Sequence, residues 1–178
     1  MSKVNIVFYC PEIPQNTGNI MRTCVATNTS LHLIEPLGFK LTDAKIKRSG
    51  ANHIQYCDYK VYPSWEDFFS KNEGVYYFLT RYGHKGMQDI VVNKDDGKNY
   101  YFVIGKESTG IAKHILKDHL DECIRLPMTN LVRSLNVSNV AAIMIYEALR
   151  QIGFDGLSEE EPENFKGKDF LENYEGDE

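Results

Sequence analysis

Long hydrophobic runs are missing from this sequence, and none approaches the roughly 20 residues that a membrane-spanning helix requires. Glycine and proline are also few, 13 and 6 of 178 residues, which excludes collagen-like and proline-rich chains. The N-terminal segment MSKVNIVFYCPE reaches a proline after a short apolar run and has no small-residue cleavage site. These absences predict a single soluble domain with no membrane partner, located in the cytoplasm.

Cysteine is scarce as well, with 4 residues in the whole chain. Cys10, Cys24, Cys57 and Cys123 are widely separated and form no CxxC pair of the kind that zinc sites use. We interpret them as reduced thiols and expect no metal site.

An excess of positive charge is missing too. The net charge of −5 argues weakly against a nucleic-acid partner, because phosphate binding relies on lysine and arginine. The charge is unevenly distributed, however: residues 159–178 carry nine acidic residues and two lysines, whereas residues 1–158 have a net charge of +2. A basic stretch over residues 40–60 fits a solvated helix face and a nucleic-acid contact surface equally well.

What the sequence does contain is a regular alternation of short β-favouring runs and helical segments. The pattern predicts strands at 3–9, 31–34, 56–61, 75–80, 100–105 and 123–126, and helices at 19–28, 42–50, 64–71, 111–117 and 135–152. This succession predicts an α/β fold with a mainly parallel sheet and helices on both faces. We expect residues 1–155 to form this domain and residues 156–178 to be an acidic, flexible tail.

Three polar segments exceed what the connections of such a fold require. In PEIPQNTGNIMR a loop leads into a helix with Arg22, although an ordinary strand-to-helix connection would explain this segment alone. In FVIGKESTGIA a buried strand breaks at Gly105 into a loop with Glu107, without the spacing of a Walker loop or a dinucleotide fingerprint. In IRLPMTNLVRSLNVSNVAAIMIYEAL more polar residues gather at the start of an apolar helix than one N-cap, Ser134 or Asn136, requires.

Taken in order, these three segments resemble the three motifs of the SPOUT RNA methyltransferases. The spelling PEIPQNTGNI and the segment LHLIEPLGF are most similar to the tRNA (cytidine(34)-2'-O)-methyltransferase family, which modifies the wobble nucleotide. The resemblance covers about residues 3–155. It implies a C-terminal trefoil knot, the α/β knot, which composition alone does not indicate and which the general rule against knots would reject.

The resemblance also implies S-adenosyl-L-methionine (AdoMet) as cofactor, held in the knot, with no metal. Carried onto this sequence, the cofactor-binding positions are Leu79, Gly105, Leu126 and Ser134, with Met128 and Leu135 lining the adenine pocket. The matching catalytic positions are Arg22, Asn16, Glu107 and Asn136. Arg22 is expected to bind RNA phosphate and orient the reacting hydroxyl, because a guanidinium with a pKa above about 12 is a poor base.

A homodimer is the expected assembly. The helix at 135–152 places Ile143 and Tyr146 off its main apolar stripe, where a second surface would cover them. We expect the helix with Ile20 and Cys24 to pack at the same two-fold interface. The resemblance agrees and implies that Arg22 of one subunit reaches the cofactor of the other.

The expected function is therefore AdoMet-dependent methylation of the ribose 2'-hydroxyl of cytidine or modified uridine at tRNA position 34, with tRNA and not DNA as partner. Methylation of another tRNA position or of rRNA is the alternative within the same family. An RNA-binding protein without activity and a flavodoxin-like interaction domain are the alternatives outside it.

Overall fold

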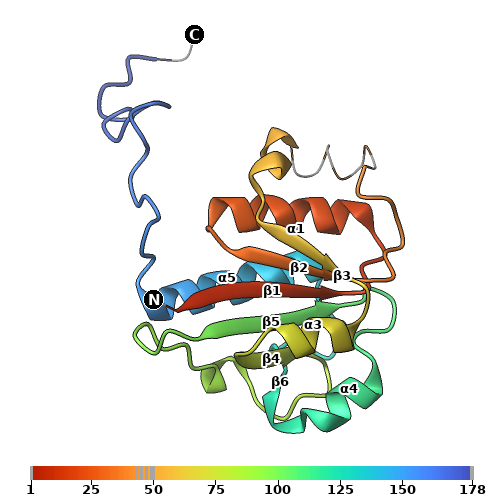
Figure 1. Cartoon of the computed structure of the whole chain (residues 1–178). Coiled ribbons are helices and arrows are strands. Elements are labelled where there is room, and N and C mark those ends of the chain that lie inside the picture. The colour runs from red at the N-terminus through yellow and green to blue at the C-terminus, as the bar shows by residue number, and fades with distance from the viewer. Residues whose placement is uncertain (1, 43, 45, 47, 49–50, 177–178) are drawn as a thin grey trace.

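The computed structural model describes residues 2–42, 44, 46, 48 and 51–176, without the side chains of 51–53. Within this part of the chain, six parallel strands form one sheet in the order β3-β2-β1-β5-β4-β6 (Figure 1). The strands are β1 (Lys3–Tyr9), β2 (Ser30–Ile34), β3 (Tyr59–Tyr62), β4 (Val75–Leu79), β5 (Asn99–Gly105) and β6 (Cys123–Ile124). The predicted parallel α/β sheet is confirmed.

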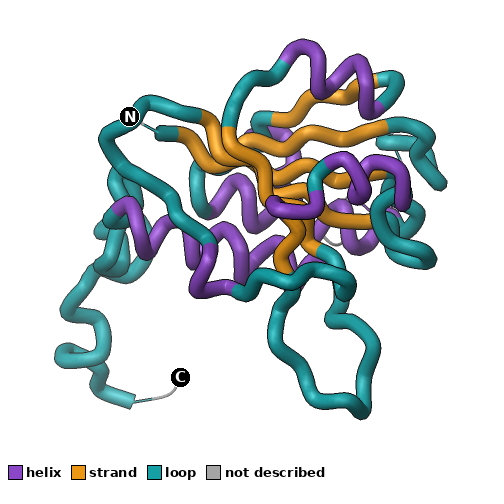
Figure 2. Tube along the Cα trace, turned by 90° about the horizontal axis from the view of Figure 1, so that it is seen from below, coloured by secondary structure: helices purple, strands orange, loops and turns teal. Residues whose placement is uncertain are grey.

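Helices cover both faces of this sheet, as Figure 2 shows. They are α1 (Pro14–Ala26), α3 (Trp65–Lys71), α4 (Lys113–Asp118) and α5 (Val137–Ile152), with the 3-10 turns η1 (Ala51–Tyr56), η2 (Met87–Asp89) and η3 (Leu120–Glu122). Helices α1 and α5 share one core with alternate strand residues such as Ile6 and Phe8. Helices α3 and α4 pack with Val7 and its neighbours on the other face. The alternation along β1 therefore divides the core into two layers.

Several predicted boundaries are wrong. Helix α1 begins at Pro14 rather than near Asn19, because proline supplies helical φ at the first position and needs no N–H there. Helix α5 begins at Val137, after Asn136 caps it by accepting a hydrogen bond from the Ser138 N–H. Strand β6 is shorter than predicted, and β3 begins only at Tyr59. The predicted helix at 42–50 lies largely outside the described residues.

A buried polar group in the second layer is formed around His32. His32 of β2 lies with Nδ1 3.1 Å from Tyr62 Oη and Nε2 3.2 Å from Asn5 Oδ1. Its ring also contacts the edges or faces of Phe68 and Tyr101. Burial lowers the pKa of His32 to about 4, so the imidazole is neutral in the folded protein near neutral pH.

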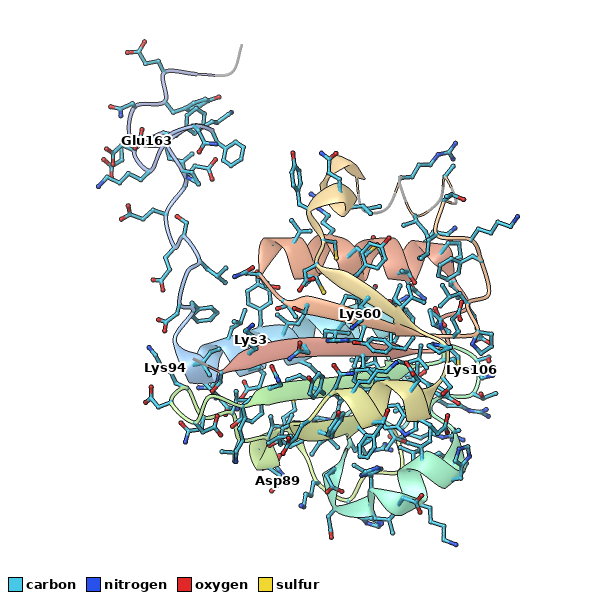
Figure 3. All side chains as sticks on the ribbon, viewed as in Figure 1. Lys3, Lys60, Asp89, Lys94, Lys106 and Glu163 are labelled. Carbon is cyan, nitrogen blue, oxygen red and sulfur yellow. The ribbon has the colours of Figure 1, made fainter. Side chains whose placement is uncertain are left out.

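After α5 the chain leaves the body as a series of turns that extends away from the sheet (Figure 1). The Phe165 and Gly167 N–H groups both donate to the Pro162 carbonyl, and Lys166 Nζ lies 4.2 Å from the centre of the Phe170 ring. In Figure 3, Glu163 of this tail lies far from Lys106, which marks the carboxyl ends of the central strands. The flexibility of the tail stays a prediction.

Candidate active site

A cavity of about 760 Å³ opens where β4, β5 and β6 end and where α1 and α5 begin. The carboxyl ends of parallel strands are the usual place for ligands in α/β sheets. The cavity brings together nine of the ten residues predicted for the site: Asn16, Leu79, Gly105, Glu107, Leu126, Met128, Ser134, Leu135 and Asn136. Their individual roles stay predictions.

Glu107 fixes the start of α1. Its carboxylate accepts hydrogen bonds from the Glu12 N–H at 2.8 Å, the Ile13 N–H at 3.1 Å and Asn16 Nδ2 at 3.1 Å. The N-cap residue of α1, Ile13, has no side chain that could do this. A carboxylate from a distant loop therefore accepts the N–H groups of the two residues that lead into the positive end of the helix.

Asn16 and Asn136 extend this contact to α5. Asn136 Nδ2 donates to Asn16 Oδ1 at 3.0 Å, and Asn136 Oδ1 accepts from the Ser138 N–H at 2.8 Å and from Ser138 Oγ at 2.6 Å. The Asn16 side chain is buried. A continuous series of hydrogen bonds thus joins the three polar segments that sequence analysis had identified.

Glu12 and Ser108 form a second link that sequence analysis missed. Glu12 accepts from the Ser108 N–H and from Ser108 Oγ, each at 2.8 Å. These hydrogen bonds lower the pKa of the Glu12 carboxyl. Both residues lie inside the recognised motifs, but no spacing rule pairs them.

The backbone conformation and the close neighbours of residue 105 require a glycine there. Its φ of +89° lies in the left-handed region, and a Cβ there would stand 2.7 Å from the Tyr9 carbonyl oxygen and 2.7 Å from Phe8 Cδ2. The sharp exit from β5 into the Glu107 loop therefore depends on glycine.

Arg22 does not line this cavity. It lies on α1 six residues after Asn16, about 240° around the helix, and its side chain is exposed. The single chain therefore separates Arg22 from the three other predicted catalytic residues.

The mouth of the cavity is basic and carries one aromatic ring. Among the described residues, its lining contains the cations Arg81, Lys106, Lys113 and Arg133 and one acidic residue, Glu107. Tyr82 lies beside Arg81, whose Nη2 donates to Tyr82 Oη at 2.6 Å and lowers the pKa of the phenol. Sequence analysis missed this pair, although its position directly after a buried strand was a usable signal.

The chemistry of the lining fits a nucleoside cofactor. The volume lies within the range of small-molecule sites, and Leu79, Leu126, Met128 and Leu135 offer an apolar wall to an adenine ring. Among the described residues, no three His, Cys, Asp or Glu side chains come close enough together to hold a metal ion. No helix in the same part of the chain has the length and apolar character to cross a membrane.

Comparison with known proteins decides the family. Residues 3–146 match the SpoU rRNA methylase family. The chain belongs to this family. A Geobacillus stearothermophilus protein assigned as a tRNA (cytidine(34)-2'-O)-methyltransferase is 46% identical over 156 residues, which are 87% of this chain and 99% of the relative.

Solved structures of relatives agree with the assignment of this chain to the SpoU family. A Bacillus anthracis RNA methyltransferase superposes with a TM-score of 0.82 at 49% identity, over 87% of this chain and 98% of that one. A structure described for 2-OH methylation of C/U34 on tRNA superposes with a TM-score of 0.77 at 33% identity, over 84% and 96%.

Proposed function

We propose that this chain is a tRNA (cytidine(34)-2'-O)-methyltransferase, which methylates the ribose 2'-hydroxyl of cytidine or modified uridine at the wobble position. The observation that carries the proposal is the cavity at which Glu107, Asn16 and Asn136 are hydrogen bonded in series. A relative with 46% identity over nearly its whole length carries the same assignment.

The chemistry requires the 2'-hydroxyl to be held in line with a methyl sulfonium and to lose its proton. AdoMet, when bound, supplies that methyl group. Glu107 is a positioning residue, because its oxygens already accept three hydrogen bonds from the start of α1. Asn16 and Asn136 hold the loops in register at the ribose, and the proton passes to the neighbouring RNA phosphate or to water.

The cofactor position follows from the same cavity. Leu79, Gly105, Leu126 and Ser134 line the cavity and would hold AdoMet through their backbone, and Met128 and Leu135 would line the adenine pocket. This assignment rests on the family motifs and on the apolar character of these walls.

The chain is further proposed to form a trefoil knot around β6. The Thr80 N–H donates to the Ile124 carbonyl at 3.0 Å, and the Arg125 N–H donates to the Lys85 carbonyl at 2.8 Å. Residues 124–125 therefore lie between two parts of the loop that follows β4. Gly83 belongs to that loop, and a Cβ there would stand 2.7 Å from the Cys123 carbonyl oxygen. These contacts support threading of the C-terminal segment through the loop.

The active unit is proposed to be a homodimer in the cytoplasm, formed by residues 1–155, with the tail at its periphery. Several apolar side chains are exposed in the single chain, among them Leu131 and Val132 in the loop before α5 and Tyr146 on α5. Ile20 and Cys24, expected at the interface, are buried in the core instead, so that part of the expectation is wrong. Arg22 on the exposed side of α1 is then free to reach the cavity of the partner subunit.

The test is methyl transfer from labelled AdoMet to tRNA of a strain that lacks this protein, followed by nucleoside mass spectrometry. The expected product is 2'-O-methylated cytidine or modified uridine at position 34. Methylation of rRNA, the substrate in the family's description, or of another tRNA position would instead support the alternative. Failure to bind AdoMet would contradict the enzyme assignment altogether.

A further inference from the structure

Tyr82 is the one aromatic residue among those that line the cavity. It follows β4, in the loop that also contributes Thr80 and Arg81 to the cavity lining. Tyr82 is 51% exposed while it lines the cavity, so it is accessible to a ligand from solvent. An exposed aromatic ring at the entrance of a basic cavity is the arrangement by which proteins stack an unpaired RNA base.

Two cations lie over this ring, Arg81 from the loop after β4 and Lys113 from the start of α4. The Arg81 guanidinium lies 4.8 Å from the ring centre and donates to the phenol oxygen, while Arg125 Nη1 donates to the Arg81 carbonyl at 2.6 Å. Lys113 Nζ lies 4.9 Å from the ring centre and donates to the Ile111 carbonyl at 3.2 Å. The ring is therefore positioned before any ligand binds.

The cofactor has other partners for its own ring. The apolar wall proposed for adenine is built from Leu79 at the end of β4 and from Leu126, Met128 and Leu135, which follow β6. Tyr82 lies in the loop after β4 and is available to a second planar group. The surrounding excess of lysine and arginine suits a nucleotide that brings phosphates with it.

We infer that Tyr82 is the stacking platform for the base of the nucleotide whose ribose is methylated, with Arg81 and Lys113 fixing the ring and facing the neighbouring phosphates. The inference rests on the proposed function, because it takes an unpaired RNA nucleotide as substrate. Stacking discriminates little between bases, since every base has a π-face. Such a platform accepts cytidine and uridine alike.

The experiment compares Tyr82→Phe, Tyr82→Leu and Tyr82→Ala with the wild-type chain, and Phe165→Ala serves as the matched control. Phe165 is also an exposed aromatic residue, but it lies in the tail. Loss of the ring in the Leu and Ala variants is expected to lower kcat/KM for tRNA by about 5- to 150-fold, mostly through KM, the range of one lost base–aromatic stack. The Phe variant and the control should stay within about twofold of wild type, because the stacking face is kept.

Two further measurements separate the outcomes. AdoMet affinity by calorimetry should be the same for all variants, and a parallel loss of it would overturn the inference by placing the ring on the cofactor. An anticodon stem-loop with a fluorescent cytidine analogue at position 34 should change its emission on binding wild-type but not Tyr82→Ala protein. Full activity of Tyr82→Leu would also overturn the inference, because leucine keeps bulk without a π-face.

Failure of the proposed function gives a different pattern. A wild-type chain that methylates another RNA but not position 34 contradicts the proposed substrate, and the same variants measured on that RNA still test Tyr82. Normal methylation at position 34 by every Tyr82 variant contradicts the stacking role alone.

Discussion

Asn136 at the start of α5 donates a hydrogen bond of 3.0 Å to Asn16 in the first turn of α1, across 120 residues of sequence. Each of these side chains also serves its own neighbourhood, since Asn16 donates to Glu107 and Asn136 caps α5. The contact therefore makes the geometry of the cavity depend on two helix starts at once. Substitutions of Asn136 can separate the contact with Asn16 from the capping of α5.

Asn136→Asp should damage activity more than stability. The carboxylate keeps an acceptor for the Ser138 N–H but has no donor for Asn16 Oδ1, so the cap remains and the junction is lost. Asn136→Ala removes both and should lower the free energy of unfolding by about 1 kcal/mol, the usual cost of a lost N-cap. Chemical denaturation and initial rates of methyl transfer check this pair. Equal activity of wild type and Asn136→Asp would show that the junction is not needed for catalysis.

Glu107→Gln should destabilise the protein by about 1–3 kcal/mol, because the new NH2 group faces a backbone N–H that loses its acceptor. AdoMet affinity should fall as well, since the loop after Gly105 lines the cavity. Glu73→Gln, an exposed change before β4, is the control and should leave the denaturation midpoint unchanged. A wild-type midpoint for Glu107→Gln would rule out the anchoring role.

His32 should make the protein unstable in acid. Its pKa is lowered to about 4 in the folded state against 6.5 when unfolded, so its contribution is fully present above pH 6.5. As the pH falls from 6.5 to 4, the unfolded state takes up the proton first, and about 3 kcal/mol of stability is lost. The free energy of unfolding, measured by urea denaturation, should change less with pH across this range for His32→Gln than for wild type. His84→Gln, at an exposed histidine, should keep the wild-type slope.

Arg22→Ala should bind AdoMet normally and lose most turnover, because Arg22 lies outside the cavity of its own chain. Mixing this variant with the Asn136→Asp variant tests whether Arg22 of one subunit serves the cavity of the other. A mixed dimer has one cavity with intact Asn136 that faces an intact Arg22 of the partner subunit. Recovery of activity on mixing two inactive variants is expected, and no recovery would place Arg22 within its own site.

Removal of residues 156–178 should leave the dimer and the activity intact. The ion pair of 2.8 Å between Lys94 Nζ and Asp155 lies just before the tail and is kept in the shortened chain. Sedimentation at micromolar concentration of the full chain and of a chain ending at Asp155 is the measurement. A monomer only after truncation would place the tail in the interface, and a monomeric full chain would contradict the dimer.

Sequence reasoning predicted the parallel sheet because buried strands such as β1 and β5 are nearly continuous apolar runs. The motifs also named most of the cavity lining. What local patterns could not provide were contacts between distant segments. The hydrogen bonds from Glu107 to the start of α1, and the position of the Tyr82 ring between Arg81 and Lys113 of α4, depend on how the chain folds back.

The error over Ile20 and Cys24 has a similar cause. An apolar stripe on a helix indicates that the stripe is covered, but not what covers it. In α1 the cover is the sheet and α5. The early start of α1 was missed because PEIPQN was read as loop, although proline is favoured in a first helical turn.

The anchoring of α1 by Glu107 has a mechanical consequence for a two-fold assembly. The loop that borders the cavity also accepts hydrogen bonds from the start of the helix that carries Arg22, so that the positions of loop and helix are linked. In a dimer where each arginine serves the neighbouring cavity, tightening the loop around a ligand in one subunit steadies the cation used by the other. The placement of Arg22 at a neighbouring cavity would then depend on the same three hydrogen bonds that shape the cavity of its own chain.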